Sequence, residues 1–149
     1  MQVNNTAKVA IGLLASASLL LPTVAIAGRY QDQIRAQLTI AAMALGLGDY
    51  YLFYDPYIDS LSDNSEDNLT FTLKRGGTYA IVGVCDEDCR DIDFELYDEN
   101  GNSVEVDRDT DDYPIVEITP RWTGKFRLEV DMYSCSTSYC YYGVGVFRQ

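Results

Sequence analysis

From Leu69 to the end of the chain, hydrophobic residues recur at every second position, and no helical pattern interrupts them. A period of two is typical of strands that bury one face and leave the other in water. Turn signals separate these stretches at intervals of roughly ten residues. The pattern predicts about seven short strands, within residues 69–73, 78–84, 92–97, 104–106, 115–119, 126–130 and 141–147.

Short strands separated by turns, with no helix between them, are typical of a mainly β domain. Asn100-Gly101 is a hairpin signal, because Asn-Gly readily adopts the positive φ that tight turns need. We therefore expect residues 69–149 to form an antiparallel β-sandwich or jelly roll.

The first 27 residues have the organisation of an export signal. An apolar stretch from Val9 to Leu21 follows a polar start, Pro22 ends it, and Ala25-Ile26-Ala27 supplies the small residues that signal peptidases require. The sequence predicts a signal peptide over residues 1–27 and a mature chain with no stable membrane span. An uncleaved membrane anchor is the alternative, since 9–27 approaches the length that spans a bilayer.

Residues 28–48 have the spacing of an α-helix that ends near Gly46 or Gly48. One face gathers Tyr30, Ile34, Leu38, Ala42 and Leu45. This face must pack on the sandwich, on a second copy of the chain or on a partner protein. Residues 49–68 follow as a linker or loop with acidic and polar residues in its second half.

The four cysteines form two local pairs. An even number of cysteines in a small exported domain favours disulfides, and we expect Cys85–Cys89 and Cys135–Cys140. A zinc site is the alternative, although the spacings differ from the usual Cys-x-x-Cys and the chain has no histidine.

The net charge of −12 excludes a basic face of the kind that binds nucleic acid. It equally disfavours electrostatic attachment to an anionic membrane. With the export signal and the cysteines, it places the protein in the periplasm or the extracellular space.

Residues 69–147 resemble the pre-peptidase C-terminal domain family of secreted bacterial β-sandwiches. The resemblance is carried by Gly77-Thr78-Tyr79, by the stretch from Asp91 to Asp98 followed by Asn100-Gly101, and by 123–128. It implies a non-catalytic accessory module that in some cases binds calcium or assists attachment to a substrate or surface. No catalytic domain accompanies the module here, and the cysteine pairs are not part of the family pattern.

Catalysis is not expected, because the chain lacks the histidine that usually serves as general base. The cysteines are better explained as disulfides. A hydrolase that uses paired carboxylates is a distant third alternative for the function.

Calcium is a candidate cofactor, since 13 of the 23 acidic residues lie between Asp86 and Asp112. Carboxylates in flexible loops are the oxygen ligands that Ca²⁺ prefers. The candidate ligands, which need not all act together, are Asp86, Asp88, Asp91, Asp93, Asp107, Asp109, Asp111 and Asp112. Solvated acidic loops are the alternative interpretation.

Tyrosine is abundant, with 12 in the chain, and several lie around the second cysteine pair. Exposed tyrosines bind protein partners or stack on sugars. The candidate partner-binding residues are Tyr133, Tyr139, Tyr141 and Tyr142. The sequence thus predicts an exported, non-catalytic interaction or structural module, calcium-stabilised and self-associating through its helix. A polysaccharide- or cell-surface-binding domain is the alternative.

Overall fold

The computed structural model describes residues 24–149, except for the side chains of 24–27 and 29. Within these residues one helix precedes nine strands. The elements are α1 (Val24–Ala44), β1 (Tyr51–Leu52), β2 (Tyr57–Ser62), β3 (Ser65–Leu73), β4 (Tyr79–Cys85), β5 (Cys89–Tyr97), β6 (Ser103–Asp107), β7 (Ile115–Ile118), β8 (Gly124–Cys135) and β9 (Tyr139–Arg148).

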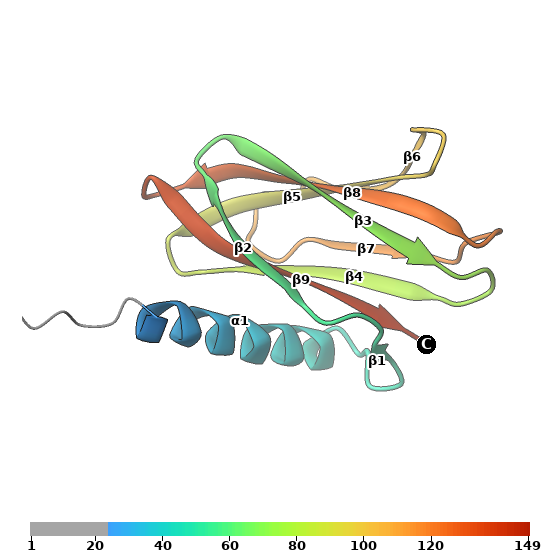
Figure 1. The fold of residues 1–149 in the computed structure, drawn as a ribbon, viewed down its shortest axis with the longest axis horizontal. Coiled ribbons are helices and arrows are strands. Elements are labelled where there is room, and N and C mark those ends of the chain that lie inside the picture. The colour runs from blue at the N-terminus through green and yellow to red at the C-terminus, as the bar shows by residue number, and fades with distance from the viewer. Residues whose placement is uncertain (1–23) are drawn as a thin grey trace, which may run out of the picture.

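The strands form two antiparallel sheets that pack face to face, as the sequence predicts. One sheet has the order β1-β9-β4-β7, with β2 also paired to β9, and the other has the order β3-β8-β5-β6. Figure 1 shows the helix lying along the outer side of the first sheet, so the domain has three layers. We call the first the covered sheet and the second the open sheet.

The main core lies between the two sheets. Alternate residues of the open sheet point inward, including Phe94 on β5 and Phe126 and Leu128 on β8, and all three are buried. They meet Ile81 and Val144 from the covered sheet in one hydrophobic cluster. Because these residues follow the period of two in the sequence, the pattern alone identifies this core.

A second core lies between the helix and the covered sheet. Ile34 and Leu38 of α1 are buried against Val82 and Val84 of β4, together with Phe147. All seven residues of β4 are buried, because one face meets the open sheet and the other meets the helix. The helix therefore packs on its own domain through the face expected from the sequence, although Leu45 at the end of that face is exposed.

Two glycines of β9 make room for the helix. A Cβ atom on Gly143 would lie 2.2 Å from Cγ2 of Ile34. A Cβ on Gly145 would lie 3.3 Å from Cδ2 of Leu38 and 2.8 Å from the Phe147 ring. The missing side chains form the depression in which the helix rests.

The helix ends where the sequence predicts. Gly46 has a φ of 74°. Its N–H donates to the Met43 carbonyl at 3.1 Å, and the Leu47 N–H donates to the Ala42 carbonyl at 2.9 Å. These two bonds form a Schellman motif, which satisfies carbonyls left free at a helix end.

The helix begins earlier than expected, at Val24 rather than residue 28. Its first turn includes the predicted cleavage site, Ala25-Ile26-Ala27. The remainder of the predicted signal peptide, residues 1–23, lies outside the described residues. Within the described part of the chain, no helix is long and apolar enough to cross a membrane.

The expectation of a linker over residues 49–68 is wrong in its secondary structure. This segment contains β1, β2 and the first residues of β3. Tyr51 and Leu52 pair with the end of β9, and Tyr57–Ser62 pair with its earlier part. Both strands lie at the edge of the sheet and are mostly exposed, so they lack the alternation that marks a half-buried strand.

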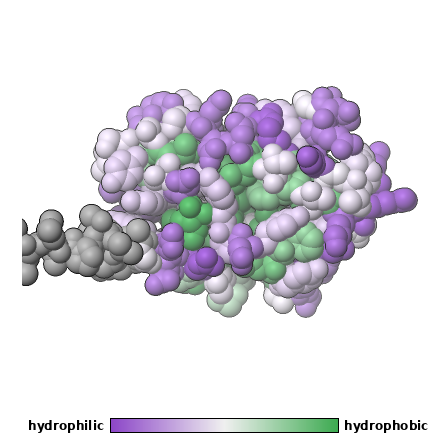
Figure 2. Space-filling view, in the orientation of Figure 1, coloured by the Kyte–Doolittle hydropathy of each residue, from purple (hydrophilic) through white to green (hydrophobic). Residues whose placement is uncertain are grey.

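The surface of the domain is uneven in polarity. In Figure 2, hydrophilic residues gather along the upper rim of the view, over the open sheet, while hydrophobic residues reach the surface in patches lower down. Exposed apolar side chains near the helix include Ile40, Met43, Tyr51 and Leu52.

Candidate functional site

Two disulfides brace one end of the sandwich, with the pairing that the sequence favours. Cys85 is bonded to Cys89 and Cys135 to Cys140. Cys85 ends β4 of the covered sheet and Cys89 begins β5 of the open sheet, while Cys135 and Cys140 connect β8 to β9 in the same way. Each bond therefore ties one sheet to the other, rather than closing a loop within one sheet.

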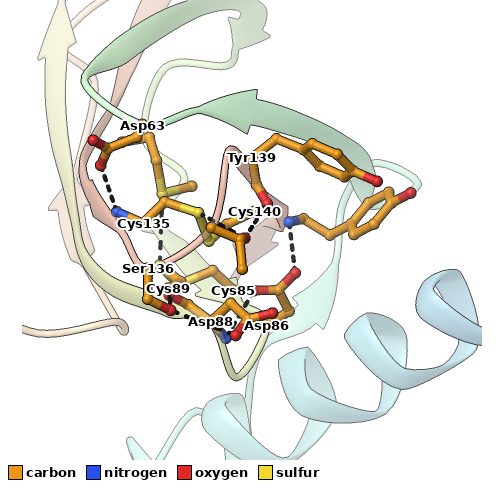
Figure 3. The surroundings of a disulfide bond; sticks show 12 residues. Asp63, Cys85, Asp86, Asp88, Cys89, Cys135, Ser136, Tyr139 and Cys140 are labelled. Carbon is orange, nitrogen blue, oxygen red and sulfur yellow. Dashed lines mark hydrogen bonds between the residues drawn. A yellow bond between two sulfur atoms is a disulfide. The ribbon is translucent and has the colours of Figure 1, made fainter.

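Hydrogen bonds join the two disulfide-closed loops (Figure 3). The Ser136 N–H and hydroxyl donate to the Asp88 carbonyl at 2.8 and 2.7 Å. The Asp86 carboxylate accepts from the Tyr141 N–H at 2.8 Å, and the Asp86 N–H donates to the Tyr141 carbonyl at 3.0 Å. Asp63, from the turn before β3, accepts from the Cys135 N–H at 2.8 Å. Hydrogen bonds between side chains and backbone groups thus hold the two loops together at this end of the domain.

The four predicted tyrosines separate into different environments. Tyr133 and Tyr139 are exposed, to 60% and 50%, and Tyr141 is partly buried. Tyr142 is fully buried between the sheets, and its hydroxyl donates to the Asp67 carboxylate at 2.7 Å. The expectation that Tyr142 contacts a partner is therefore wrong, since neighbouring residues of a strand point to opposite faces and Tyr142 points inward.

Tyr139 and Tyr141 line an open recess of about 300 Å³ beside the disulfides. We call it the tyrosine recess, and its lining residues are Tyr30, Asp86, Asp88, Thr137, Ser138, Tyr139 and Tyr141. The Tyr30 ring, from the helix, stacks on Tyr141 with centroids 4.5 Å apart. Tyr139 meets Tyr141 edge to face at 5.7 Å. Three rings from two elements that are distant in sequence thus meet at one recess.

The recess is acidic. Its lining includes two aspartates, and no lysine or arginine among the described residues. The carboxylate of Asp86 is directed at backbone N–H groups of Asp88 and Tyr141, so it is held in place. Burial, together with the neighbouring Tyr139, raises the pKa of the Tyr141 hydroxyl. The recess therefore presents neutral aromatic rings beside held negative charge.

The predicted calcium ligands divide into two groups. Asp86 and Asp88 belong to the tyrosine recess. Asp91 and Asp93 lie on β5, and the pKa values of both are raised, first by burial and then by nearby carboxylates. Asp111 contributes to the shift at Asp91 and Asp107 to that at Asp93, so the later loop does approach this strand.

Two of the loop aspartates accept hydrogen bonds from backbone groups within or next to the loop. Asp107 accepts from the N–H groups of Asp109 and Ile115, and Asp111 accepts from that of Tyr113. Of the remaining candidates, Asp109 is exposed and Asp112 is partly buried. Within residues 24–149, no group of three or more Asp, Glu or Cys residues is arranged to hold a metal ion as it stands.

Two residues of interest were not identified from the sequence. Tyr30 was assigned to the buried face of the helix, and only the docking of the helix on β9 brings it onto Tyr141. Asp131 lies on β8 directly opposite Asp93 on β5. No local signal marks either residue, because both depend on contacts between segments distant in the chain.

Comparisons with known proteins give little more. No family model matches the chain, and no curated protein is similar to it in sequence. The resemblance to the pre-peptidase C-terminal family therefore stays a prediction. Among solved structures, the chain is similar to Aeromonas hydrophila PliG, described as a periplasmic inhibitor of g-type lysozyme. The identity is 14%, the TM-score is 0.48, and the match covers 64% of this chain and 85% of that one. A similarity of this size carries no inference about function.

Proposed function

We propose that this chain is an exported, non-catalytic binding domain whose tyrosine recess accepts a lysine or arginine side chain of a protein partner. The observation that carries the proposal is the set of three tyrosine rings beside Asp86 and Asp88 at the disulfide-braced end. A cation near aromatic faces is attracted by the ring quadrupole, and nearby carboxylates add to the attraction.

The rigidity of this end supports a binding role. The two disulfides and the hydrogen bonds between their loops hold the recess in one conformation before a partner arrives. A preorganised site loses less conformational entropy on binding. The exposed ring of Tyr139 supplies contact area at low entropic cost, as tyrosines do at many protein interfaces.

The overall charge supports a basic partner. A net charge of −12 attracts basic proteins and repels acidic ones over distances of about 10 Å at moderate salt. Two disulfides are typical of proteins that work in an oxidising compartment, which supports export.

The residues that could carry out catalysis support a non-catalytic role. All four cysteines are in disulfides, and the chain has no histidine. Asp93, whose pKa is raised to about 6, is the carboxyl group most altered toward general acid behaviour. It borders a recess of about 20 Å³, which leaves no room for a substrate.

Sugar binding by the same tyrosines is the alternative. A sugar ring stacks best on a flat aromatic platform, whereas Tyr139 and Tyr141 meet at an interplanar angle of 83°. This edge-to-face geometry favours a cationic side chain over a sugar ring.

Titration with an oligolysine peptide, followed by calorimetry, tests the proposal. Oligoglutamate of the same length is the charge control, and a neutral oligosaccharide tests the alternative. We expect Tyr139→Ala to weaken oligolysine binding about tenfold, while Tyr133→Ala, which removes an equally exposed tyrosine outside the recess, leaves it unchanged. Equal effects of the two substitutions would contradict the proposal. Binding of the oligosaccharide alone, lost in Tyr139→Ala, would favour the alternative.

Self-association through α1 is a separate proposal. The helix buries one face on its own domain, but Ile40, Met43 and Leu45 remain exposed, and Ile40 and Leu45 line an apolar groove of about 360 Å³ with Tyr113. Sedimentation of the wild type and of Met43→Asp tests it. A dimer that dissociates in the variant supports self-association, and a monomeric wild type at high concentration contradicts it.

A further inference from the structure

The basic side chains of this acidic protein gather at one end of the sandwich. Five of the 11 lysines and arginines lie there, and we call this group the basic end: Lys74, Arg75, Arg121, Lys125 and Arg148. Among the described residues, the ion pairs are those of Arg108 and Arg127, so none of the five is paired with a carboxylate. The exposed glutamates of neighbouring segments, Glu99 and Glu117, do not pair with them either.

Two of the five cations contact aromatic rings of their own chain. The Lys74 ammonium lies 5.9 Å from the centre of the Phe53 ring, and the Arg148 guanidinium lies 5.4 Å from the same centre. Arg75, Arg121 and Lys125 are exposed and have no such contact among residues 24–149. Their charged groups are therefore available to another molecule.

Arg75 lies in a turn whose backbone is fixed. The turn connects β3 to β4, and its Gly76 has a φ of 75°. The Arg75 N–H donates to the Thr123 hydroxyl at 2.9 Å, and the Gly76 N–H donates to the Pro120 carbonyl at 3.2 Å. The turn is thus held against the turn between β7 and β8. An exposed arginine on a held turn loses little backbone entropy when it binds.

The basic end and the tyrosine recess lie at opposite ends of the domain. β4 begins at Tyr79, just after the Arg75 turn, and ends at Cys85, directly before Asp86 of the recess. Seven residues of strand extend over roughly 20 Å. Figure 1 shows the β3–β4 turn and the β8–β9 turn at the two ends of the long axis. Arg75 therefore cannot reach the recess of its own chain.

The recess lacks a cation of the kind that the basic end presents. Its lining contains three tyrosines with Asp86 and Asp88, and no lysine or arginine among the described residues. A guanidinium group is planar, stacks on aromatic rings and pairs with carboxylates. The volume of about 300 Å³ is sufficient for an arginine side chain. The two ends are thus complementary in charge and in chemistry.

The net charge determines how two copies can approach. At physiological salt the repulsion that arises from −12 is screened beyond about 8 Å, so the groups that meet decide the contact. Contact between two open sheets would bring together the carboxylates of Asp93 and Asp131 from both copies. End-to-end contact brings cations onto the acidic recess instead, so it is the orientation that the charges favour.

We propose that the partner of the tyrosine recess is a second copy of this chain, which inserts Arg75 from its basic end. The inference rests on the proposed function, because it names the partner of that same site. Each copy then has a recess at one end and an arginine at the other, and a head-to-tail contact of this kind continues from copy to copy. Since the two ends are opposite, the assembly is an open chain of copies. It differs from a symmetric dimer through α1.

Two variants that each remove one half of the contact test the proposal. Arg75→Glu keeps the recess, and Tyr139→Ala keeps the basic end. Both proteins also carry Met43→Asp, which removes association through α1. We expect each variant alone to associate at least about tenfold more weakly than the protein with Met43→Asp alone. An equimolar mixture should form a 1:1 dimer in analytical ultracentrifugation, because one intact recess meets one intact arginine.

A symmetric contact cannot give this result, because it needs the same surface on both copies. A mixture that remains monomeric overturns the proposal. Arg35→Glu, which makes the same charge change at an exposed position in the middle of α1, is the control and should associate like the parent protein. Equal weakening by Arg35→Glu and Arg75→Glu would assign the effect to net charge and would also overturn the proposal.

Oligolysine separates this inference from the proposed function. Arg75→Glu retains the recess and should bind oligolysine, and the peptide should dissociate the assemblies of the parent protein. If Arg75→Glu binds oligolysine but the mixed variants do not dimerise, self-association through the recess is wrong and the proposed function stands. If neither binding nor dimerisation occurs, both are wrong.

Discussion

The two sheets of this domain have the same antiparallel pairing but different surroundings. The covered sheet lies between the open sheet and the helix, and its strand β4 is buried at every position. The open sheet has water on one side, and its strand β5 alternates between buried and partly buried residues from Ile92 to Tyr97. The comparison shows how one chain builds a fully buried strand and a strand with a charged outer face from the same antiparallel pairing.

The helix accounts for the difference. It rests on β9 because Gly143 and Gly145 leave a depression there, and it buries the outer side chains of β4. Within residues 24–149 no helix covers the open sheet, so its outward residues are free to be charged. Asp93 of β5 and Asp131 of β8, which lie directly opposite each other, are on that face.

The largest expected effect is on the helix-covered layer. Leu38→Ala removes a side chain that is 2% exposed, and we expect a loss of about 3 kcal/mol in the free energy of unfolding, since it leaves a cavity. Ile40→Ala, on the same helix but 62% exposed, should change stability by less than about 0.5 kcal/mol. Urea denaturation of both variants measures the contrast. If the two losses are equal, the helix is not an integral layer.

The next largest effect is expected from the two disulfides that link the sheets. Replacing Cys135 and Cys140 by alanine should lower stability by about 2 kcal/mol, because a short closed loop restricts the unfolded chain only moderately. The same double change at Cys85 and Cys89 is the matched comparison, since both bonds link the two sheets at one end. Thermal unfolding in the absence of reductant measures both, and an unchanged midpoint in either variant would show that its bond contributes nothing.

A smaller effect, of opposite sign, is expected on the open sheet. Burial and neighbouring carboxylates raise the pKa of Asp93 to about 6 in the folded protein, so ionisation at pH 7 costs stability that is fully present below pH 4. Asp93→Asn should therefore stabilise the protein at pH 7 by about 1–2 kcal/mol and have little effect at pH 4. Denaturation at the two pH values measures it, with Glu87→Gln, an exposed loop residue, as the control. Destabilisation at pH 7 would contradict the account.

The smallest effect tests a carboxylate between the sheets. The hydrogen bond from Tyr142 lowers the pKa of Asp67, so Asp67 contributes stability above its unfolded pKa that is lost as the pH falls through the folded value. Tyr142→Phe should cost about 1 kcal/mol at pH 7 and less at pH 3. Tyr133→Phe, at an exposed position, should show no such pH dependence. A loss independent of pH would mean that packing, rather than the hydrogen bond, is responsible.

The sequence was most informative where local pattern and structure coincide. The seven predicted strands correspond to β3 through β9, because each alternates or forms a short apolar run between turn signals. The cysteine pairing is local, and so is the helix end at Gly46, where the required positive φ favours glycine.

The sequence was least informative where a residue's surroundings come from distant segments. The edge strands β1 and β2 are mostly exposed, so they have no alternation to detect. Their partner β9 lies roughly 80 to 100 residues later. No sequence pattern distinguishes Tyr141 from its neighbour Tyr142. Because successive side chains of a strand point to opposite faces, Tyr141 lines the tyrosine recess and Tyr142 is buried. No sequence pattern marks Asp131, and only the register of β8 with β5 brings it opposite Asp93.

Backbone amide NMR of the isotopically labelled protein, titrated with oligolysine, tests the binding proposal most directly, because the domain has two acidic regions. The account predicts shift changes concentrated in the tyrosine recess, around Tyr30, Asp86–Asp88 and Thr137–Tyr141. The amides of Asp93 and Asp131 should change little, since the recess of about 20 Å³ between these two residues is too small for a lysine side chain. Changes centred on β5 and β8, with the recess unaffected, would contradict the account and move the partner to the open sheet.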